Sequence, residues 1–179
     1  MKKLNLGSGN DIRKGWVNVD LIDIAGADII HNLDHFPYPF EDSTFNQMIA
    51  GDIMEHLHNP NKFIKELWRI GKDGCEIKII TPHFTAGEVS EDLSHKRGFA
   101  FRSLQQFDIK RDSYEDRFMN PEGIKFEIDV EITFGRLWTS MGISFLVNKF
   151  PLVYENLFAY IFQARKIVYK LKVIKGIYK

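Results

Sequence analysis

The order of apolar and polar positions predicts alternating strands and helices in the first half of the chain. Short apolar runs bounded by Gly, Pro, Asn or Asp are typical of buried strands. The clearest helix begins at Pro60 with Asn59 as N-cap, and it carries Phe63, Leu67 and Ile70 on one face. Strands are predicted at residues 3–6, 16–19, 27–31, 47–50 and 76–80. This alternation is typical of an α/β fold with a mostly parallel sheet.

Two segments of the second half, residues 125–134 and 166–175, alternate apolar and polar side chains. Such alternation is typical of strands with one solvated face. Residues 71–74, Gly-Lys-Asp-Gly, predict a turn that leads from the first helix back into the sheet. Residues 103–106, Ser-Leu-Gln-Gln, match a capping box and predict the start of another helix.

Residues 137–163 are rich in Leu, Phe, Tyr and Ile, but polar residues interrupt the roughly 20-residue apolar run that a membrane span requires. Our preferred interpretation is a helical insert packed on the core, and the alternative is a lid or a seat for an apolar substrate. The chain after Gln163 is basic and has no acid, so residues 137–179 allow a peripheral contact with an anionic membrane surface. More often, lysines on an exposed strand prevent edge-to-edge pairing. The basic residues are Arg165, Lys166, Lys170, Lys172, Lys175 and Lys179.

Composition narrows the class of protein. The 179 residues are 44% hydrophobic and 27% charged, which fits one globular domain. The 24 basic and 24 acidic residues balance, so no overall field attracts nucleic acid, and we expect no nucleic-acid partner. Cys75 is the single cysteine and no signal peptide is evident, which predicts a reducing, cytoplasmic setting. We expect Cys75 to be a small residue at a strand entry rather than a nucleophile.

The candidate chemistry begins at Gly7 and Gly9, which follow the first predicted strand, and at Asp20, which ends the second. Glycine lets a ligand approach the backbone, and a carboxylate offers acceptors for both hydroxyls of a ribose. A dinucleotide site would have a third glycine where Ile12 stands, and an acid about 20 positions on rather than 13. These departures weaken the case for NAD and favour S-adenosylmethionine, which has no phosphate. The simpler interpretation is a tight turn between two strands.

Five motifs in order strengthen the nucleoside interpretation. They are residues 4–10, 17–21, 39–45, 54–57 and 77–82, and residues 92–97 and 148–151 add weaker similarity. With these motifs, residues 3–82 resemble a small branch of class I S-adenosylmethionine-dependent methyltransferases of the type 11 kind. The resemblance implies a Rossmann-like, doubly wound, mostly parallel sheet with an antiparallel edge hairpin. It also implies a single domain over residues 1–179, with a cofactor-binding half at 1–82 and substrate-side inserts or a lid at 83–124 and 135–163.

The resemblance assigns roles to residues at the strand ends. It implies that the glycine turn contacts the methionine portion and that Asp20 holds the ribose, with Leu21 also at the cofactor. It further implies that Asn32 and Leu33 lie beside adenine, with Asp34 as a competitor for Asn32. Gly51 and Asp52 would border the methionine tail and the acceptor. Glu55 and His56 match the family's Glu-His pair, which can also simply brace the strand end. The residues of the glycine turn are Leu6, Gly7, Ser8 and Gly9.

The chain departs from the family in its first crossover. Ten residues separate Gly9 from Asp20, at the lower limit of roughly 10–12 for a parallel crossover with a helix. We therefore predict a turn or a single helical turn there. The sequence begins directly in the first strand, so we expect the later inserts, or a second subunit in a homodimer, to cover the cofactor.

Candidate catalytic residues are His95, His83 and Asp92. His83 directly follows the fifth predicted strand, and His95 lies in a polar segment with Asp92 three residues before it. Imidazole suits proton transfer near neutrality, and a carboxylate orients the ring and raises its basicity. An ordinary structural histidine is the commoner role. There is no His-Glu-x-x-His motif and no cysteine cluster, so we expect no metal site.

The function we predict is S-adenosylmethionine-dependent methyl transfer to a small-molecule or glycan-type acceptor. The protein's main task would be to align donor and acceptor, and a base is needed only when the acceptor keeps its proton. The alternatives are a non-catalytic, degenerate Rossmann-like binding module and a nucleotide-binding protein of another type.

Overall fold

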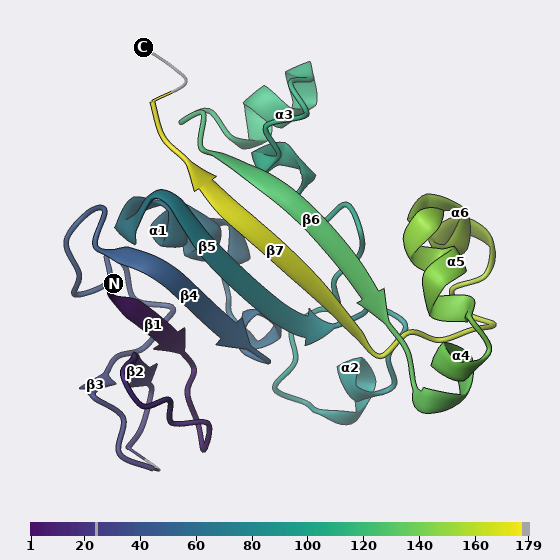
Figure 1. The fold of residues 1–179 in the computed structure, drawn as a ribbon, viewed down its shortest axis with the longest axis horizontal. Coiled ribbons are helices and arrows are strands. Elements are labelled where there is room, and N and C mark those ends of the chain that lie inside the picture. The colour runs from purple at the N-terminus through teal and green to yellow at the C-terminus, as the bar shows by residue number, and fades with distance from the viewer. Residues whose placement is uncertain (24, 177–179) are drawn as a thin grey trace.

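The computed structural model describes residues 1–23 and 25–176, so Lys179 of the basic tail lies outside the described residues. Seven strands form one sheet in the order β3-β2-β1-β4-β5-β7-β6 (Figure 1). Neighbouring strands are parallel except at β7, which runs antiparallel to β5 and to β6. The predicted fold class, including the antiparallel edge pair, is confirmed. The strands are β1 (Lys3–Leu6), β2 (Val17–Asp20), β3 (Ile29–Ile30), β4 (Phe45–Gly51), β5 (Gly71–Pro82), β6 (Lys125–Thr133) and β7 (Lys166–Ile174).

The turn predicted at residues 71–74 lies inside β5 rather than before it. Gly71 already pairs with Phe45, and the next pair is Gln47 with Glu76, so the intervening residues of β5 bulge out of the ladder. Gly74 takes a left-handed conformation (φ +75°) at this irregularity, which glycine adopts without strain.

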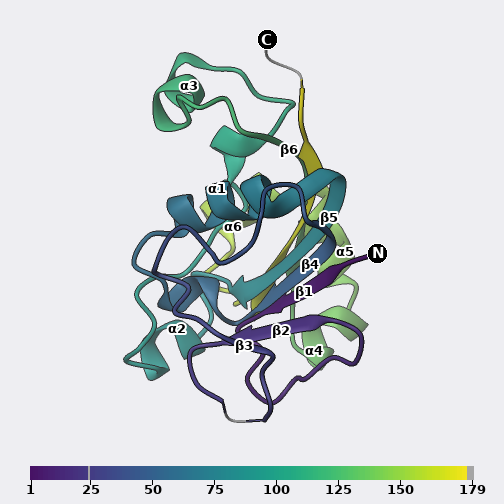
Figure 2. The same ribbon diagram turned by 90° about the vertical axis from the view of Figure 1, so that its left-hand side faces the viewer.

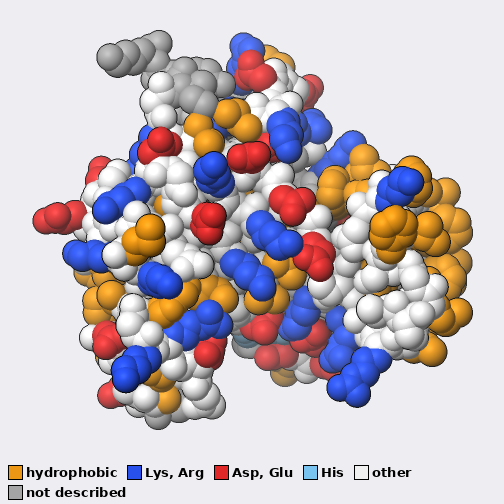
Figure 3. All heavy atoms as spheres, viewed as in Figure 1, with side chains coloured by type: hydrophobic (Ala, Val, Ile, Leu, Met, Phe, Trp, Pro, Cys, Tyr) orange, Lys and Arg blue, Asp and Glu red, His pale blue; other side chains and the backbone are white. Residues whose placement is uncertain are grey.

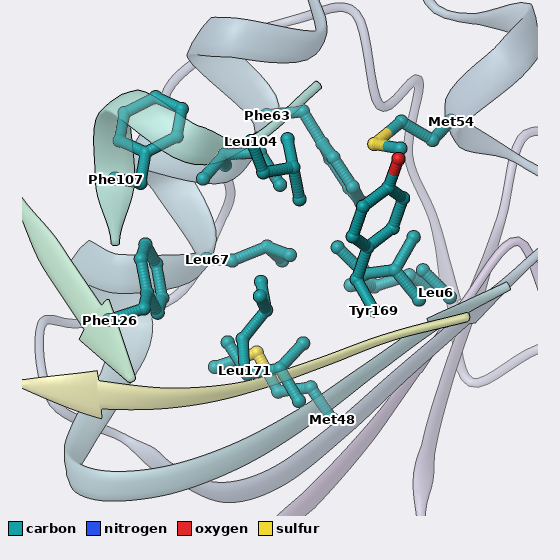
Figure 4. Close-up of a cluster of buried hydrophobic side chains, with 14 of the residues drawn as sticks. Leu6, Met48, Met54, Phe63, Leu67, Leu104, Phe107, Phe126, Tyr169 and Leu171 are labelled. Atoms are coloured by element: carbon teal, nitrogen blue, oxygen red, sulfur yellow. The ribbon is translucent and has the colours of Figure 1, made fainter. Parts of the chain in front are cut away.

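Helix α1 (Pro60–Ile70) packs on one face of the sheet (Figure 2). As predicted, Asn59 caps it, with its side-chain oxygen accepting the Lys62 N–H at 3.0 Å. The apolar side of the helix is fully buried and meets strand residues such as Leu6, Met48 and Leu171 (Figure 4). The core therefore lies between α1 and this face.

The opposite face of β5–β7 is mostly charged, with one apolar pair, Ile80 and Val168, toward the start of β7. Ile77 of β5 pairs with Leu171 of β7, and both point to the packed face. One residue along, Lys170 of β7 lies between Lys78 of β5 and Asp129 of β6 on the opposite face. The Lys170 ammonium lies 2.9 Å from a Glu131 oxygen. Figure 3 shows side chains of both charges across this face, with some apolar ones between them. In the ribbon of Figure 1, no helix of the described chain lies in front of β5–β7.

The prediction that a helix begins at residues 103–106 is wrong. Ser103 Oγ accepts the Ala100 N–H at 2.9 Å, so it holds a loop instead of capping a helix, and only a 3₁₀ turn, η2 (Gln105–Phe107), follows. The capping box lies ten residues on, where Ser113 and Asp116 begin α3 (Tyr114–Met119).

Residues 135–163 form a helical insert of α4 (Arg136–Ser140), α5 (Ile143–Lys149) and α6 (Pro151–Leu157). The side chain of Asn148 accepts the Ile132 N–H at 2.7 Å and donates to the Ile132 carbonyl at 2.8 Å, like an added strand residue on the edge strand β6. Tyr154 is buried, but most large apolar side chains of the insert are exposed (Figure 3). They are Leu137, Met141, Phe145, Leu146, Phe150, Val153, Leu157, Phe158, Tyr160 and Ile161.

The length of the helices matters for how the exposed apolar surface is interpreted. Among the described residues, none of the helices combines the length and the apolar character needed to cross a bilayer. The insert is helical, as expected, but only a minority of its apolar side chains, such as Val147 and Tyr154, are buried.

Candidate functional site

The two glycines of the first turn have different neighbours. Both take left-handed conformations, with φ +64° at Gly7 and +47° at Gly9. A Cβ on Gly7 would lie 2.9 Å from Ile53 Cγ1, so packing within the protein already requires glycine there. On Gly9 a Cβ would meet no described atom within 4 Å. Gly9 is thus the position that leaves open space beside the backbone.

Asp20 joins the ends of β1 and β2. One of its carboxylate oxygens accepts the Gly9 N–H at 2.7 Å, and the other accepts the Leu21 N–H at the same distance. Each carboxylate oxygen can accept a further hydrogen bond, so the group still has acceptor capacity for ligand hydroxyls. Leu21 itself is exposed and offers apolar surface next to this carboxylate.

A turn replaces the first crossover helix, as predicted, and two asparagines hold it. Asn5 and Asn18 are paired across β1 and β2, and both are buried. The Asn5 amide donates to the Asp11 carbonyl at 2.7 Å, and Asn18 Oδ1 accepts the Arg13 N–H at 2.9 Å. Asp28 accepts from the Asn18 backbone at 2.7 Å. Sequence reasoning missed this network, although buried asparagines in two short strands were its signal.

The residues expected beside adenine lie after β3. Asn32 Oδ1 accepts the Asp34 N–H at 2.9 Å, and the buried Leu33 accepts from the Tyr38 hydroxyl at 2.8 Å through its carbonyl. The Asp34 carboxylate binds His58, whose backbone N–H and Nδ1 both lie 2.8 Å from it. Both candidate side chains thus already bond with protein groups, and the choice between Asn32 and Asp34 as the adenine contact stays a prediction.

These features fit a nucleoside that carries no phosphate. A carboxylate on the glycine turn suits ribose hydroxyls, and the open space at Gly9 suits a ligand that approaches the backbone. In the described structure no helix lies between Gly9 and β2, so the helix N-terminus that a pyrophosphate site uses is missing there.

A second group of candidate residues lines an open cavity of about 630 Å³ at the ends of β4 and β5. A cavity of this size accommodates a small molecule. β4 and β1 are neighbours with Ala50 opposite Leu6, so this cavity and the glycine turn lie at the same edge of the sheet. The lining contains five carboxylates and one lysine. The lining residues are Asp52, Glu55, His56, Glu88, Glu91, Asp92, Leu93, His95 and Lys166.

Asp52 and Lys166 shape the rim of this acidic pocket. Asp52 has a left-handed backbone (φ +51°), which Asp tolerates better than most residues, and its N–H donates to the Ile80 carbonyl at 2.9 Å. Lys166 lies 2.8 Å from Asp52 and 2.7 Å from Glu88. Burial lowers the pKa of Lys166, but the hydrogen bonds to these two carboxylates outweigh it and raise the pKa overall.

Glu55 and His56 lie on the 3₁₀ turn η1 (Met54–His56), directly under the pocket. Glu55 is completely buried, and one of its oxygens accepts from the Thr81 hydroxyl at 2.9 Å. The other, Oε1, has no hydrogen-bond partner among the described residues. Burial raises the pKa of the Glu55 carboxyl.

The structure brings His95 and Asp92 together in the pocket. His95 Nε2 lies 3.8 Å from Asp92 Oδ2 and 4.0 Å from Glu55 Oε1. His95 Nδ1 lies 2.8 Å from the carbonyl of Glu88, at the start of α2 (Glu88–Glu91). Hydrogen bonds from Ser94 lower the pKa of Asp92, so this carboxylate is charged over a wider range of pH.

His83 lies elsewhere. It is fully buried, with Nδ1 2.7 Å from Thr85 Oγ1 and Nε2 3.3 Å from Glu155 of the insert. This arrangement fits a structural role, while a catalytic role for His83 stays a prediction. Burial raises the pKa of the Cys75 thiol to about 12, as expected for an inert cysteine.

The strand order and the single antiparallel strand define the class of fold. No protein-family model matched the sequence, and a search of curated proteins found no match. Solved structures do match, and the chain has the fold of class I S-adenosylmethionine-dependent methyltransferases.

Three of the solved structures show how far the similarity extends. A SAM-dependent methyltransferase from Archaeoglobus fulgidus has a TM-score of 0.61 at 15% identity, over 96% of this chain and 85% of that one. The phosphoethanolamine N-methyltransferase 2 of Haemonchus contortus in complex with S-adenosyl-L-methionine has a TM-score of 0.55 at 14% identity, over 98% of this chain and 49% of that one. The [4+2]-cyclase SpnF has a TM-score of 0.61 at 14% identity, over 98% and 76%. At these identities the similarity shows the fold, and the cyclase illustrates that the fold alone does not fix the reaction.

Proposed function

We propose that the chain binds S-adenosylmethionine at the ends of β1 and β2 and transfers its methyl group to a small-molecule or glycan-type acceptor. One observation carries the proposal: the Asp20 carboxylate is bonded to the Gly9 N–H at 2.7 Å, at the same edge of the sheet as the acidic pocket. Donor and acceptor sites at one edge are what an in-line displacement needs.

The residues expected to hold the cofactor have distinct tasks. Asp20 accepts from the ribose hydroxyls, and the backbone of the glycine turn, residues 6–9, contacts the methionine portion. Leu21, Asn32 and Leu33 border the adenine. Gly51 and Asp52 separate the cofactor from the acceptor. The cofactor supplies a methyl group on a positively charged sulfur, which is already activated for displacement.

The charge of the pocket limits the class of acceptor. Its carboxylates outnumber its one lysine, and Lys166 is already paired with Asp52 and Glu88. Carboxylates accept hydrogen bonds from hydroxyls and repel phosphates. We therefore favour a neutral acceptor rich in hydroxyl groups, such as a sugar, over a nucleic acid.

A hydroxyl acceptor keeps its proton at neutral pH, so the proton has to be taken up or its release promoted. His95 is our candidate for this role, with Asp92 beside it. Because Nδ1 of His95 faces a carbonyl, which only accepts, the neutral ring carries its hydrogen on Nδ1 and its lone pair on Nε2. That lone pair lies on the side of Asp92 and Glu55.

Calorimetric titration with S-adenosylmethionine tests the proposal. Asp20→Ala is expected to abolish measurable binding while the circular dichroism spectrum stays that of the folded protein. Asp11→Asn is a matched control, because Asp11 is an exposed acid of the same crossover turn. Intact affinity in Asp20→Ala, or equal losses in both variants, would remove the ribose role of Asp20.

Two alternatives remain as outcomes of the same titration. Binding of NAD in place of S-adenosylmethionine would indicate a nucleotide-binding protein of another type. Binding of neither would favour a degenerate, non-catalytic module, for which the missing crossover helix is the supporting observation. If the cofactor binds, a screen of hydroxylated acceptors with radiolabelled methyl donor identifies the substrate.

Partners beyond the acceptor stay predictions. The exposed apolar side chains of the insert and the basic residues near it suit a peripheral membrane contact through residues 137–179, or a second subunit that covers the cofactor. Co-sedimentation with anionic vesicles tests the first, and analytical ultracentrifugation tests the second.

A further inference from the structure

The buried end of the acidic pocket combines three potential metal ligands. Glu55, His56 and His95 each offer one ligand atom, and these atoms all lie within 4.8 Å of one another. A metal ion bound between them would need only small side-chain movements, because carboxylate and imidazole ligands bind Zn²⁺ at about 2.0–2.2 Å. The three residues come from two segments separated in sequence, η1 and the loop after α2.

Glu55 is the second, independent observation. Its side chain is completely buried, yet Oε1 has no donor among the described residues and faces His95 Nε2 at 4.0 Å, too far for a hydrogen bond. Buried polar atoms in proteins are nearly always satisfied, so an orphaned carboxylate oxygen indicates a place where a cation or a donor can bind. The orphaned oxygen points into the ligand cluster.

The hydrogen bonds around both imidazoles leave one nitrogen of each with a lone pair. His95 Nδ1 donates to the Glu88 carbonyl, which is the usual outer partner of a metal-bound histidine. Ser94 Oγ gives its proton to Asp92 at 2.6 Å, so its 3.0 Å contact with His56 Nδ1 is one in which the imidazole donates. In the neutral form of each ring this places the hydrogen on Nδ1, and Nε2 is then the nitrogen with the lone pair that a cation can bind.

The loop that carries His95 is fixed against η1. The Lys96 N–H donates to the Glu55 carbonyl at 2.9 Å, and the Lys96 ammonium donates to the His56 carbonyl. These bonds fix the two segments that carry the three metal-binding side chains before an ion binds. Such ordering in advance raises affinity, because less conformational freedom is lost on binding. Asp92 and Asp52 line the same pocket and add negative charge that attracts a cation.

We propose that Glu55, His56 and His95 bind a divalent transition-metal ion such as Mn²⁺ or Zn²⁺, with Asp92 as a nearby further ligand. Two imidazoles with carboxylate suit these ions better than Mg²⁺ or Ca²⁺, which prefer oxygen alone. The ligand set leaves coordination positions toward the open pocket. The class of acceptor that fits is a hydroxyl compound with a second oxygen close by, such as a sugar diol, which binds the ion through both oxygens.

The role in methyl transfer rests on the proposed function, whereas the cation site does not. A hydroxyl bound to a divalent ion releases its proton more readily. As the oxygen–methyl bond forms, the methyl–sulfur bond breaks, its electron pair stays on the sulfur, and the hydroxyl proton leaves to water. His95 then acts as a metal ligand rather than as the base.

The test measures metal binding directly. The chelator-treated, full-length protein is titrated with MnCl₂ and with ZnCl₂ by calorimetry, and the melting temperature is followed with and without the ion. We expect one ion per chain and a rise in melting temperature. His95→Ala and His56→Ala are each expected to weaken binding by at least roughly tenfold to a hundredfold. His58→Ala is the matched control, since His58 is exposed, lies two residues from His56, and pairs with Asp34.

The inference is overturned if the wild type binds neither ion at millimolar concentration, or if His58→Ala loses as much affinity as His95→Ala. Glu55→Gln serves as a second variant that keeps the buried shape if an alanine variant fails to fold, and unchanged metal affinity in it would also refute the site. A metal-free titration with S-adenosylmethionine separates the two proposals. Metal binding without cofactor binding leaves the cation site standing and refutes the methyl transfer.

Discussion

The two faces of the sheet are built by the same strands and yet have opposite chemistry. On the packed face, Ile77, Leu171 and Phe126 are buried under α1 and the 84–124 segment. On the open face, one residue along each strand, Lys170 and its neighbours carry charges of both signs that pair across the strands. Because side chains point alternately to the two faces of a strand, β5–β7 are covered by protein on one face and exposed to solvent on the other.

The crossover between β1 and β2 is short and contains no helix, and the chemistry of the open face explains why. Over β5–β7 most side chains of the open face are charged, with a minority of apolar ones such as Val168, and at β1 and β2 this face carries the two asparagines that bind the crossover turn. The hydrogen bonds of Asn5 and Asn18 stabilise β1, β2 and their crossover on this face, whereas apolar packing against α1 stabilises the other face. Substitutions on the two faces should therefore differ in their effect on stability.

The largest effect is expected on the packed face. Leu171→Ala should lower the free energy of unfolding by about 3 kcal/mol, because it leaves a cavity under α1. Leu171 is 2% exposed, so little relaxation is available. Urea unfolding followed by circular dichroism measures the change. A loss near zero would mean that the packed face is not the core.

A somewhat smaller loss is expected for the asparagine network. Asn18→Ala should cost about 2 kcal/mol, because the Arg13 N–H and the Asn5 amide lose their acceptor in a largely buried place. The same variant should also weaken S-adenosylmethionine binding, since the turn next to Asp20 loosens. Lys14→Ala, an exposed change in the same turn, is the control and should alter neither quantity.

A smaller loss of stability is expected when the N-cap of α1 is removed. Asn59→Ala should lower the free energy of unfolding by about 1 kcal/mol, because the Lys62 N–H loses its acceptor at the start of α1. Asn59→Ser should recover most of the stability, as serine is also a good N-cap. If both variants unfold alike, the cap does not contribute.

The smallest effect is expected on the open face. Lys170→Ala should change the free energy of unfolding by no more than about 0.5 kcal/mol, because exposed ion pairs contribute little. Lys170 and Leu171 are adjacent in β7, so the pair compares the two faces at one place in the sheet. Equal losses in these two variants would show that something covers the open face.

Much of the sheet could be predicted from the sequence because local patterns specify it. The short apolar runs located the five parallel strands, and alternation located β6 and β7, since burial on one face imposes a period of two. The Pro60 helix followed from its cap and its apolar spacing. The false helix at Ser103 has the right letters, but the serine side chain is bonded to Ala100 in the folded chain, which a local motif cannot reveal.

The candidate site was predictable only in part, because its contacts are long-range. Asp20 and Gly9 were expected to meet, since parallel strands end at one edge. The proximity of His95 to Glu55 depends on the path of the loop after α2, which no spacing in the sequence encodes. The Asn5–Asn18 pair was missed because buried polar residues look like ordinary loop residues until the register of the strands is known.

Glu155 joins the helical insert to two segments that are distant from it in the sequence. This carboxylate on α6 bonds the Phe101 N–H at 2.6 Å and lies 3.3 Å from His83 at the end of β5. The Phe101 loop continues the segment that holds Asp92 and His95. The helical insert and the segment that leads back to the acidic pocket are thus joined through a single carboxylate oxygen.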